Sequence, residues 1–169
     1  MILLNRGTMD FLDLVKKRHS VRVYQNKRIP DEDIKYILEC ARLSPSAFNV
    51  QDFRFEVTAN RETIGKIAKA TEMVFIKSAP AVVLAIGLDE ENKYNITDVA
   101  IALDHLQLAA AEKEIGSCWV GTLGHWNVEE ALNLPENEKV YAVMPLGYDA
   151  GKLLIKKRKS FEELFKIEK

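Results

Sequence analysis

The sequence has 169 residues and a mass of 19.2 kDa, which is enough for one domain with a buried core. With 47% hydrophobic and 29% charged residues, it has the composition of a globular protein rather than a disordered chain. Its 24 basic and 25 acidic residues nearly cancel, which argues against nucleic acid as a partner, because a duplex-binding protein usually carries a basic excess.

The two cysteines, Cys40 and Cys118, lie far apart and outside any C-x-x-C motif. A metal site, a redox motif or a disulfide framework is therefore not predicted. No apolar run approaches the ~20 residues that span a bilayer, and the N-terminus lacks the basic-then-apolar order of a signal peptide. We expect a cytoplasmic protein with no membrane partner.

The chain opens with residues 1–8, which show no periodic pattern, followed by a second candidate start at Met9. We expect 1–8 to be an N-terminal extension and 9–169 to form a single domain, because no linker or repeat divides it. Thr8 is expected to cap a short first helix. The apolar residues of this helix fall at helical spacing: Phe11, Leu14 and Val15.

Helical and strand patterns then alternate. A second helix is expected to begin near Pro30 and to stop at residues 44–45, since a residue before proline resists the α region. Apolar and polar side chains alternate over residues 53–58, which predicts a half-buried strand. Residues 61–71 have a helical pattern, and the continuous apolar run at 81–86 is typical of a central strand.

The longest predicted helix covers Asp98–Glu114 and is apolar on most of its sides. Such a helix is buried on several faces, either in the centre of the protein or in a subunit interface. Gly116 is placed to end it.

The remaining patterns are shorter. Residues 117–121 are expected to form a strand, and Asn127 with Glu130 resembles a capping box. Residues 140–146 form another predicted strand, in which Pro145 indicates an edge or a strand end because it donates no ladder bond. Helices first, then strands alternating with helices, indicate an α+β domain.

Four segments carry candidate chemistry. Box 1, Lys17–Tyr24, has the sequence KRHSVRVY. Arg18, Ser20 and Arg22 alternate, so in an extended segment they would share one face. Two guanidinium groups flanking a hydroxyl make a candidate phosphate grip, because arginine offers fixed pairs of donors to oxyanions. A solvated basic strand edge is the alternative.

Box 2, Ser44–Gln51, combines helix-stopping, small and amide side chains in what we expect to be a rigid loop, although turn chemistry alone explains many such loops. Box 3, Ile115–Gly124, contains Gly121 and Gly124, which would let a flat ligand approach the backbone closely; ordinary turns are the alternative. Cys118 in this box is interpreted as a buried small hydrophobic residue rather than a nucleophile, since no basic residue neighbours it in sequence.

Box 4, Lys156–Lys159, is a basic run whose alternative interpretation is solvated surface. Histidine adds little, because His105 lies on an apolar helix and His125 has no neighbours arranged for a triad or a metal. No Walker loop and no G-x-G-x-x-G motif is present, so P-loop or Rossmann nucleotide binding is not indicated.

Taken in this order, the four boxes resemble one family, the FMN-dependent nitroreductases. Box 1 is similar to its R-x-S-x-R-x-F/Y motif and box 2 to its (A/S)-P-S-x-x-N-x-Q motif. Gly116–Gly121 resembles G-(S/T)-C-W-(I/V)-G, Lys156–Arg158 resembles the late K-x-R, and Met144–Tyr148 is similar to the strand that precedes it. The likeness runs from Met9 to the C-terminus.

The resemblance implies an α+β fold with a central, mainly antiparallel sheet flanked by helices, an intertwined homodimer, and one FMN per subunit at the interface. The cofactor-binding residues that it implies are Arg18, His19, Ser20, Arg22, Pro45, Ser46, Ala47, Asn49, Trp119, Val120, Gly121, Thr122, Lys156 and Arg158.

The resemblance also implies a different role for each box. Boxes 1 and 4 would hold the phosphate and ribityl chain, with Arg22 giving electrostatic support near the N1–O2 edge of the flavin. Box 2 would reach the flavin from the partner subunit. The backbone of residues 119–122 would run beside the ring, with an N–H directed at N5.

The implied activity is hydride transfer from NADH or NADPH through FMN to a nitroaromatic, a quinone or a similar small acceptor, by ping-pong chemistry and with no catalytic side chain or metal. Two features depart from the family: Asp52 replaces the usual proline after box 2, and only a short polar loop follows Gly87. The alternatives are a non-catalytic flavin-binding or flavin-sensing protein, a relative that fragments reduced FMN with oxygen, and an anion-binding structural dimer without flavin.

Overall fold

The computed structural model describes residues 10–89, 91–122, 127–152 and 156–168, so the expected extension at 1–8 lies outside the described residues. A five-stranded antiparallel sheet has the order β1-β2-β5-β3, with β4 also paired to β5. Its strands are β1 Phe53–Thr58, β2 Ala81–Gly87, β3 Gly116–Ser117, β4 Val120–Gly121 and β5 Lys139–Gly147. The helices are α1 Phe11–Lys17, α2 Asp31–Arg42, α3 Arg61–Ala70, α4 Asn95–Glu112, α5 Val128–Leu132 and α6 Phe161–Leu164, with 3₁₀ turns η1 Ala47–Asn49 and η2 Val74–Ser78.

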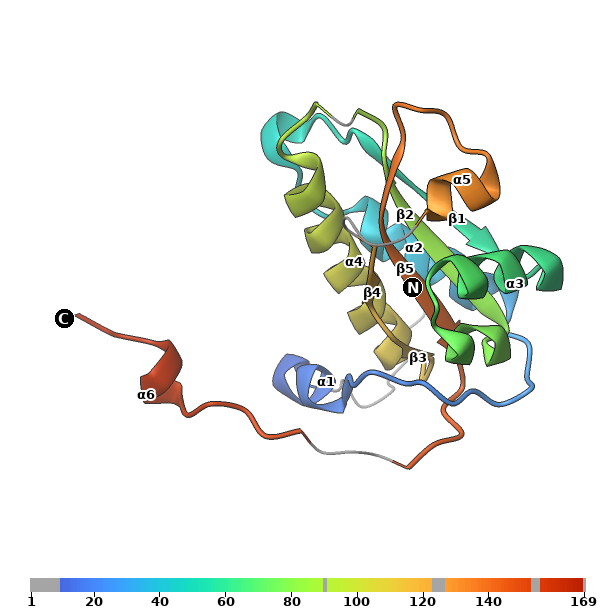
Figure 1. Cartoon of the computed structure of the whole chain (residues 1–169). Helices are drawn as coiled ribbons and strands as arrows, with labels where there is room; N and C mark the ends of the chain where they lie inside the picture. Colours follow the sequence, from blue (N-terminus) through green and yellow to red (C-terminus); the bar gives the residue numbers. More distant parts are fainter. Residues whose placement is uncertain (1–9, 90, 123–126, 153–155, 169) are drawn as a thin grey trace, which may run out of the picture.

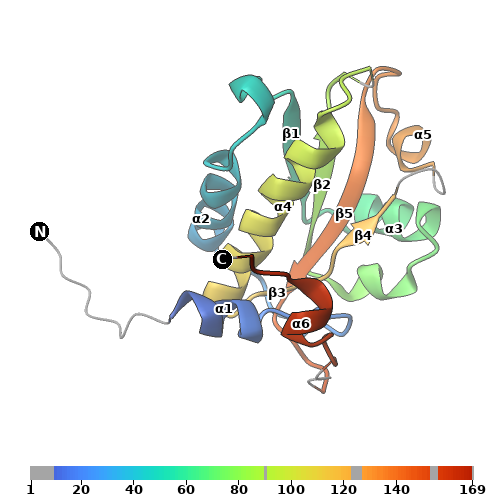
Figure 2. The same cartoon turned by 90° about the vertical axis from the view of Figure 1, so that its left-hand side faces the viewer.

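Helices cover both faces of the sheet: α2 and α4 lie on one face, and α3, η2 and α5 on the other (Figures 1 and 2). The central strand β2 is buried throughout because its alternate side chains enter two different cores. Val82, Leu84 and Ile86 pack toward α3, and the residues between them pack toward α4. The expected α+β architecture with an antiparallel central sheet is therefore confirmed.

The long helix α4 differs from its prediction at both ends. It begins at Asn95 and ends at Glu112, and Gly116 does not terminate it. The chain reverses instead at Glu114, which has a φ of 61°. Gly116 lies in β3, where a Cβ atom would sit 2.5 Å from Val21 Cγ2, so its role is to admit the Val21 side chain of box 1 rather than to cap a helix.

Strand β5 is not an edge, so the first of the two expectations raised by Pro145 is wrong; Pro145 does lie near the end of the strand, which closes at Gly147. Strand β5 pairs with β2 on one side and with β3 and β4 on the other. The Pro145 carbonyl accepts from Cys118 N at 3.3 Å, so the side on which proline lacks an N–H faces the break between β3 and β4. The strand predicted at 117–121 is therefore divided into two short strands, β3 and β4. Pro145, opposite Cys118, has no N–H and so makes only one of the two backbone hydrogen bonds of a normal strand pair.

Two predicted caps are also wrong. The N-cap of α1 is Asp10 rather than Thr8, and Asn127 before α5 bonds the side chain of Glu130 without capping the helix backbone. The helix after Pro30 is confirmed, although it ends at Arg42, two residues earlier than predicted. Within the described ranges, no helix is both long and apolar enough to cross a membrane.

Candidate functional site

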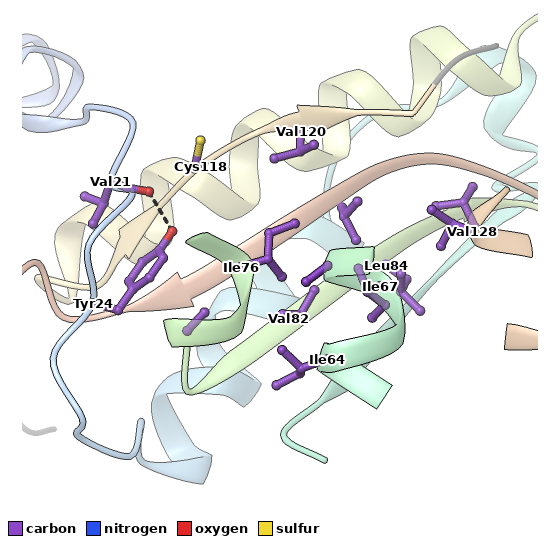
Figure 3. Packing of buried hydrophobic residues seen from close by; sticks show 14 of the residues in the cluster. Val21, Tyr24, Ile64, Ile67, Ile76, Val82, Leu84, Cys118, Val120 and Val128 are labelled. Carbon is purple, nitrogen blue, oxygen red and sulfur yellow. Dashed lines mark hydrogen bonds between the residues drawn. The ribbon is translucent and has the colours of Figure 1, made fainter. Parts of the chain in front are cut away.

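Box 1 is fixed to the sheet by its buried residues. Val21 and Tyr24 pack in the core beside Cys118, and the Tyr24 hydroxyl donates to the Val21 carbonyl at 2.7 Å (Figure 3). Val21 N donates to the Ser117 carbonyl at 2.9 Å, and Ser20 forms a parallel bridge with Ser117. Box 1 therefore continues the sheet beyond β3, and its side chains at Ser20 and Arg22 remain exposed.

The arginines of boxes 1 and 4 differ from the others in their partners. Three arginines pair with carboxylates: Arg28, Arg42 and Arg54. Arg61 donates to two backbone carbonyls. Within the part of the chain that the structure describes, no ion pair involves Arg18, Arg22, Arg158 or Lys156. Among the arginines that the structure describes, those without an ion pair or a backbone partner are therefore the ones that the sequence predicted for an anionic ligand.

Two of these cations, Arg22 and Lys156, approach Cys118. Burial raises the pKa of its thiol, while the charges of Arg22 and Lys156 and a hydrogen bond with Ser20 act in the opposite direction. Basic residues distant in sequence thus do approach this cysteine, which the sequence did not indicate. Desolvation is nonetheless the larger effect, so the pKa of the thiol is raised overall, which does not favour the thiolate that a nucleophilic cysteine needs.

Beside this cluster, β4 offers an open backbone edge. Thr122 N donates to the Tyr141 carbonyl at 3.2 Å and Cys118 N to that of Pro145, so alternate N–H groups face β5. The N–H groups of Trp119 and Gly121 consequently point away from β5. Among the residues that the structure describes, and apart from the two chain neighbours of Gly121, a Cβ atom on Gly121 would meet no atom nearer than Trp119 Nε1, at 3.9 Å. A planar ligand can therefore approach this backbone closely.

Box 2 is a tightly bent loop held by a buried carboxylate. Ala47 N donates to both oxygens of Asp98, at 3.0 and 3.2 Å, and Gln51 N donates to Ser46 Oγ at 3.2 Å. Three residues without glycine's freedom adopt positive φ: Phe48, Asn49 and Gln51. Such backbone conformations cluster at functional sites, where the surrounding structure enforces them.

An exposed aromatic pair stands at this loop. The Phe48 side chain is 87% exposed and meets Tyr94 edge-to-face, with ring centroids 5.8 Å apart. Asp52, the departure from the family motif, accepts from Asn92 Nδ2 at 3.1 Å and so ties box 2 to the short loop that carries Tyr94.

Boxes 1 and 2 lie at opposite ends of α4 (Figures 1 and 2). Box 2 bonds Asp98 in the first turn, whereas a cavity of about 100 Å³ beside Arg18 is lined by Ala111 near the last turn. At the rise of an α-helix, the distance from Asp98 to Ala111 is roughly 20 Å. The structure brings box 1, box 3 and Lys156 of box 4 together within one chain but does not bring box 2 to them.

The histidines are engaged within the chain. His19 places Nδ1 3.0 Å from the Lys17 carbonyl and Nε2 2.9 Å from Asp149 Oδ2. His105 Nδ1 lies 2.9 Å from the Ile101 carbonyl, as is common for a histidine on a helix. His125 and Gly124 lie outside the described residues.

Sequence reasoning missed the residues that hold these boxes in place. Asp98 is a carboxylate within the apolar pattern of α4, and this contrast can be seen in the sequence. Asp149 and the pair Phe48–Tyr94 carry no pattern of their own, because their contacts join distant parts of the chain.

Comparison with known proteins identifies the family and the fold. A model of the nitroreductase family matches residues 15–81 and 67–148. A protein of Archaeoglobus fulgidus, provisionally named an NADH dehydrogenase/NAD(P)H nitroreductase, is 35% identical over 146 residues, covering 81% of this chain and 84% of the relative. An iodotyrosine deiodinase of Thermotoga neapolitana is 27% identical over 162 residues, covering 80% and 87%. The structure of an FMN-dependent nitroreductase from Clostridium difficile has a TM-score of 0.80 at 27% identity, covering 90% and 94%.

The protein is thus one of the flavoprotein oxidoreductases with an antiparallel sheet between two helical layers. The chain belongs to the nitroreductase family.

Proposed function

We propose that this protein is an FMN-dependent NAD(P)H oxidoreductase that reduces a small aromatic acceptor. The observation that carries this proposal is that Arg22 and Lys156 both act on Cys118 in box 3, beside the open edge at Gly121, while Arg18 and Arg158 have no ion pair within the described residues. A phosphate with a flat ring attached fits this combination of charge and clearance.

The residues of one chain divide between the two ends of such a ligand. Arg18 and box 4 would neutralise the phosphate, and Ser20 would donate to or accept from the ribityl hydroxyls. Near the ring, the donors toward N5 would be the N–H groups of Trp119 or Gly121, since the N–H of Thr122 is already bonded to β5.

The proposed site needs two copies of the chain. Box 2 lies about 20 Å of helix away from box 1, so Pro45, Ser46, Ala47 and Asn49 would contact the flavin of the partner subunit. An apolar arm supports the same proposal: in α6 and after it, Phe161, Leu164, Phe165 and Ile167 are exposed, and α6 lies away from the body in Figure 1. A capping box between Ser160 and Glu163 forms this turn before any partner covers it.

Bound FMN would supply two-electron transfer from the nicotinamide to the acceptor, each occupying the same open face in turn. This chain's contribution is placement and electrostatics. Arg22 would stabilise the negative charge that reduction places near the N1–O2 edge, because a fixed cation there needs no reorganisation.

Replacing Arg22 with alanine should therefore impair reduction more than binding. A loss of about 1.4 kcal/mol of charge stabilisation lowers a two-electron potential by about 30 mV, and hydride transfer should slow accordingly. The midpoint potential and the anaerobic rate of flavin reduction by NADH measure this. Arg28→Ala removes an exposed arginine paired only with Asp31 and serves as the control. An Arg22→Ala protein with normal potential and rate would show that Arg22 is only a phosphate or surface contact.

Phe48 should discriminate among acceptors. In the shared site its exposed ring would form one wall over the partner's flavin, and an aromatic contact contributes about 0.5–1.5 kcal/mol beyond area burial. Phe48→Ala should raise the KM for nitroaromatics and quinones about three- to tenfold and leave ferricyanide reduction unchanged. Val74→Ala, on the exposed η2 turn, is the matched control. Equal losses with all acceptors would place Phe48 outside the acceptor site.

The likeness to an iodotyrosine deiodinase adds a second candidate acceptor, a halogenated phenol. The same aromatic wall would suit its ring, so halophenols belong in the acceptor panel beside nitroaromatics and quinones.

The visible spectrum of the purified protein, before and after anaerobic NADH or NADPH, tests the proposal. We expect a flavin spectrum that bleaches with either nicotinamide and returns when a nitroaromatic or quinone is added. A bound flavin that neither nicotinamide reduces would indicate a flavin-binding or sensing protein. Progressive aerobic loss of flavin would indicate a flavin-fragmenting enzyme, and a colourless protein that does not take up FMN would indicate an anion-binding dimer.

A further inference from the structure

Asp149 uses both oxygens of one carboxylate to join two segments of the proposed phosphate site. Oδ2 lies 2.9 Å from His19 Nε2, in box 1, and Oδ1 accepts from Gly151 N at 2.7 Å, where the chain leaves β5 toward box 4. The His19 and Asp149 side chains are about two-thirds buried, which keeps this contact partly out of water.

The backbone around Asp149 is held against the end of box 1. Tyr24 and Asp149 form an antiparallel bridge, and Gln25 N donates to the Tyr148 carbonyl at 2.8 Å. Gln25 Nε2 also donates to the Asp149 carbonyl at 2.8 Å. The two segments therefore form a short ribbon, and the Asp149 side chain reaches back from this ribbon to the start of box 1.

The His19 ring links Asp149 to the backbone next to Arg18. Nδ1 lies 3.0 Å from the Lys17 carbonyl while Nε2 faces Asp149, so the ring is held at both ends. Arg18 lies between Lys17, whose carbonyl this ring contacts, and His19 itself. Movement of the His19 ring away from Asp149 would therefore disturb the backbone on both sides of Arg18.

We propose that Asp149 is a positioning residue that fixes Arg18 and the start of the box 4 segment relative to each other, and so gives the site its preference for a ligand with a terminal phosphate. This inference rests on the proposed FMN-binding function. Geometry and charge predict opposite effects here, because a carboxylate close to a phosphate site repels the ligand. The sign of the effect on affinity therefore decides between them.

The experiment compares FMN with riboflavin, which lacks the phosphate, in fluorescence titrations of the apoprotein. In Asp149→Ala we expect the Kd for FMN to rise about tenfold or more and that for riboflavin to change less than about twofold. Asp149→Asn, which keeps one acceptor oxygen, should lie between alanine and the native residue. His19→Gln removes the imidazole from the same contact and should lower the FMN preference without adding fully to Asp149→Ala in the double variant.

Glu114→Gln is the matched control for charge, because Glu114 lines the same cavity and lies 3.4 Å from Lys17 but does not contact the ribbon. Charge alone predicts that Asp149→Ala and Glu114→Gln both bind FMN as tightly as the native protein or more tightly, and that result for Asp149→Ala would overturn the inference. So would equal losses for FMN and riboflavin in Asp149→Asn and His19→Gln, which would indicate a general structural role. Failure of the native protein to bind FMN would instead refute the proposed function.

Discussion

Replacing Arg18 and Arg158 together with alanine should weaken FMN binding at least about a hundredfold while leaving the protein folded. A hydrogen bond to a charged group contributes about 1.5–3 kcal/mol, so losing two of them corresponds to at least about two powers of ten in Kd. Neither arginine has a carboxylate partner within the described residues, so their removal leaves no buried charge uncompensated. The fold should therefore survive.

Titration of the apoprotein with FMN measures this loss, and the circular dichroism spectrum checks the fold. Arg28→Ala with Arg42→Ala removes two arginines whose partners are exposed acids on the same helix, and this control should bind FMN normally. An affinity unchanged in the Arg18 and Arg158 double variant would refute the placement of the phosphate between boxes 1 and 4.

Replacing Phe161 and Phe165 together with serine should convert the proposed dimer to a monomer. Both rings are 58% exposed in the isolated chain, and they lie 4.8 Å apart between centroids. Burying each against a partner would stabilise the dimer by about 1.5–3 kcal/mol, so the dimerisation constant should weaken by a factor of about a hundred or more. Because the proposed site is shared, FMN should be lost together with the dimer.

Sedimentation at micromolar concentration measures the assembly state. Val74→Ser, at a residue that is 73% exposed on η2, removes an apolar group that is even more exposed and should leave the proposed dimer intact. A native holoprotein that sediments as a monomer would contradict both the role of the arm and the shared site.

Local patterns in the sequence predicted the elements whose causes are local. The helix after Pro30, the strand at 53–58 and the helix beginning at Arg61 were all expected within about a residue or two of their observed bounds. The errors occur where the pairing between strands decides the structure. Pro145 suggested an edge, but its missing N–H faces a gap between two short strands, and no sequence pattern shows which side of a strand will be occupied.

The candidate site shows the same division. Box 1 and box 4 were predicted from charge and motif, and the structure places them where both influence Cys118. The contacts that hold the boxes were not predicted, because they join residues 51 positions apart for Ala47 and Asp98 and 130 positions apart for His19 and Asp149. Such pairs follow from the folded topology rather than from spacing along the chain.

The central claim, that each flavin site is built from two subunits, can be tested in a mixed dimer. One chain would carry Arg18→Ala with Arg158→Ala, and the other Ala47→Trp, which would fill the space proposed for the partner's flavin ring. Each variant alone should form a dimer without FMN. In the mixed dimer, one site would combine the intact boxes 1 and 4 of the second chain with the intact box 2 of the first.

The measurement is the FMN content of the mixed dimer, isolated through different affinity tags on its two chains. The shared site predicts about one FMN per mixed dimer, with its reduction by NADH restored. If each site were built within a single chain, both sites of the mixed dimer would be defective. A mixed dimer without FMN would therefore contradict the account.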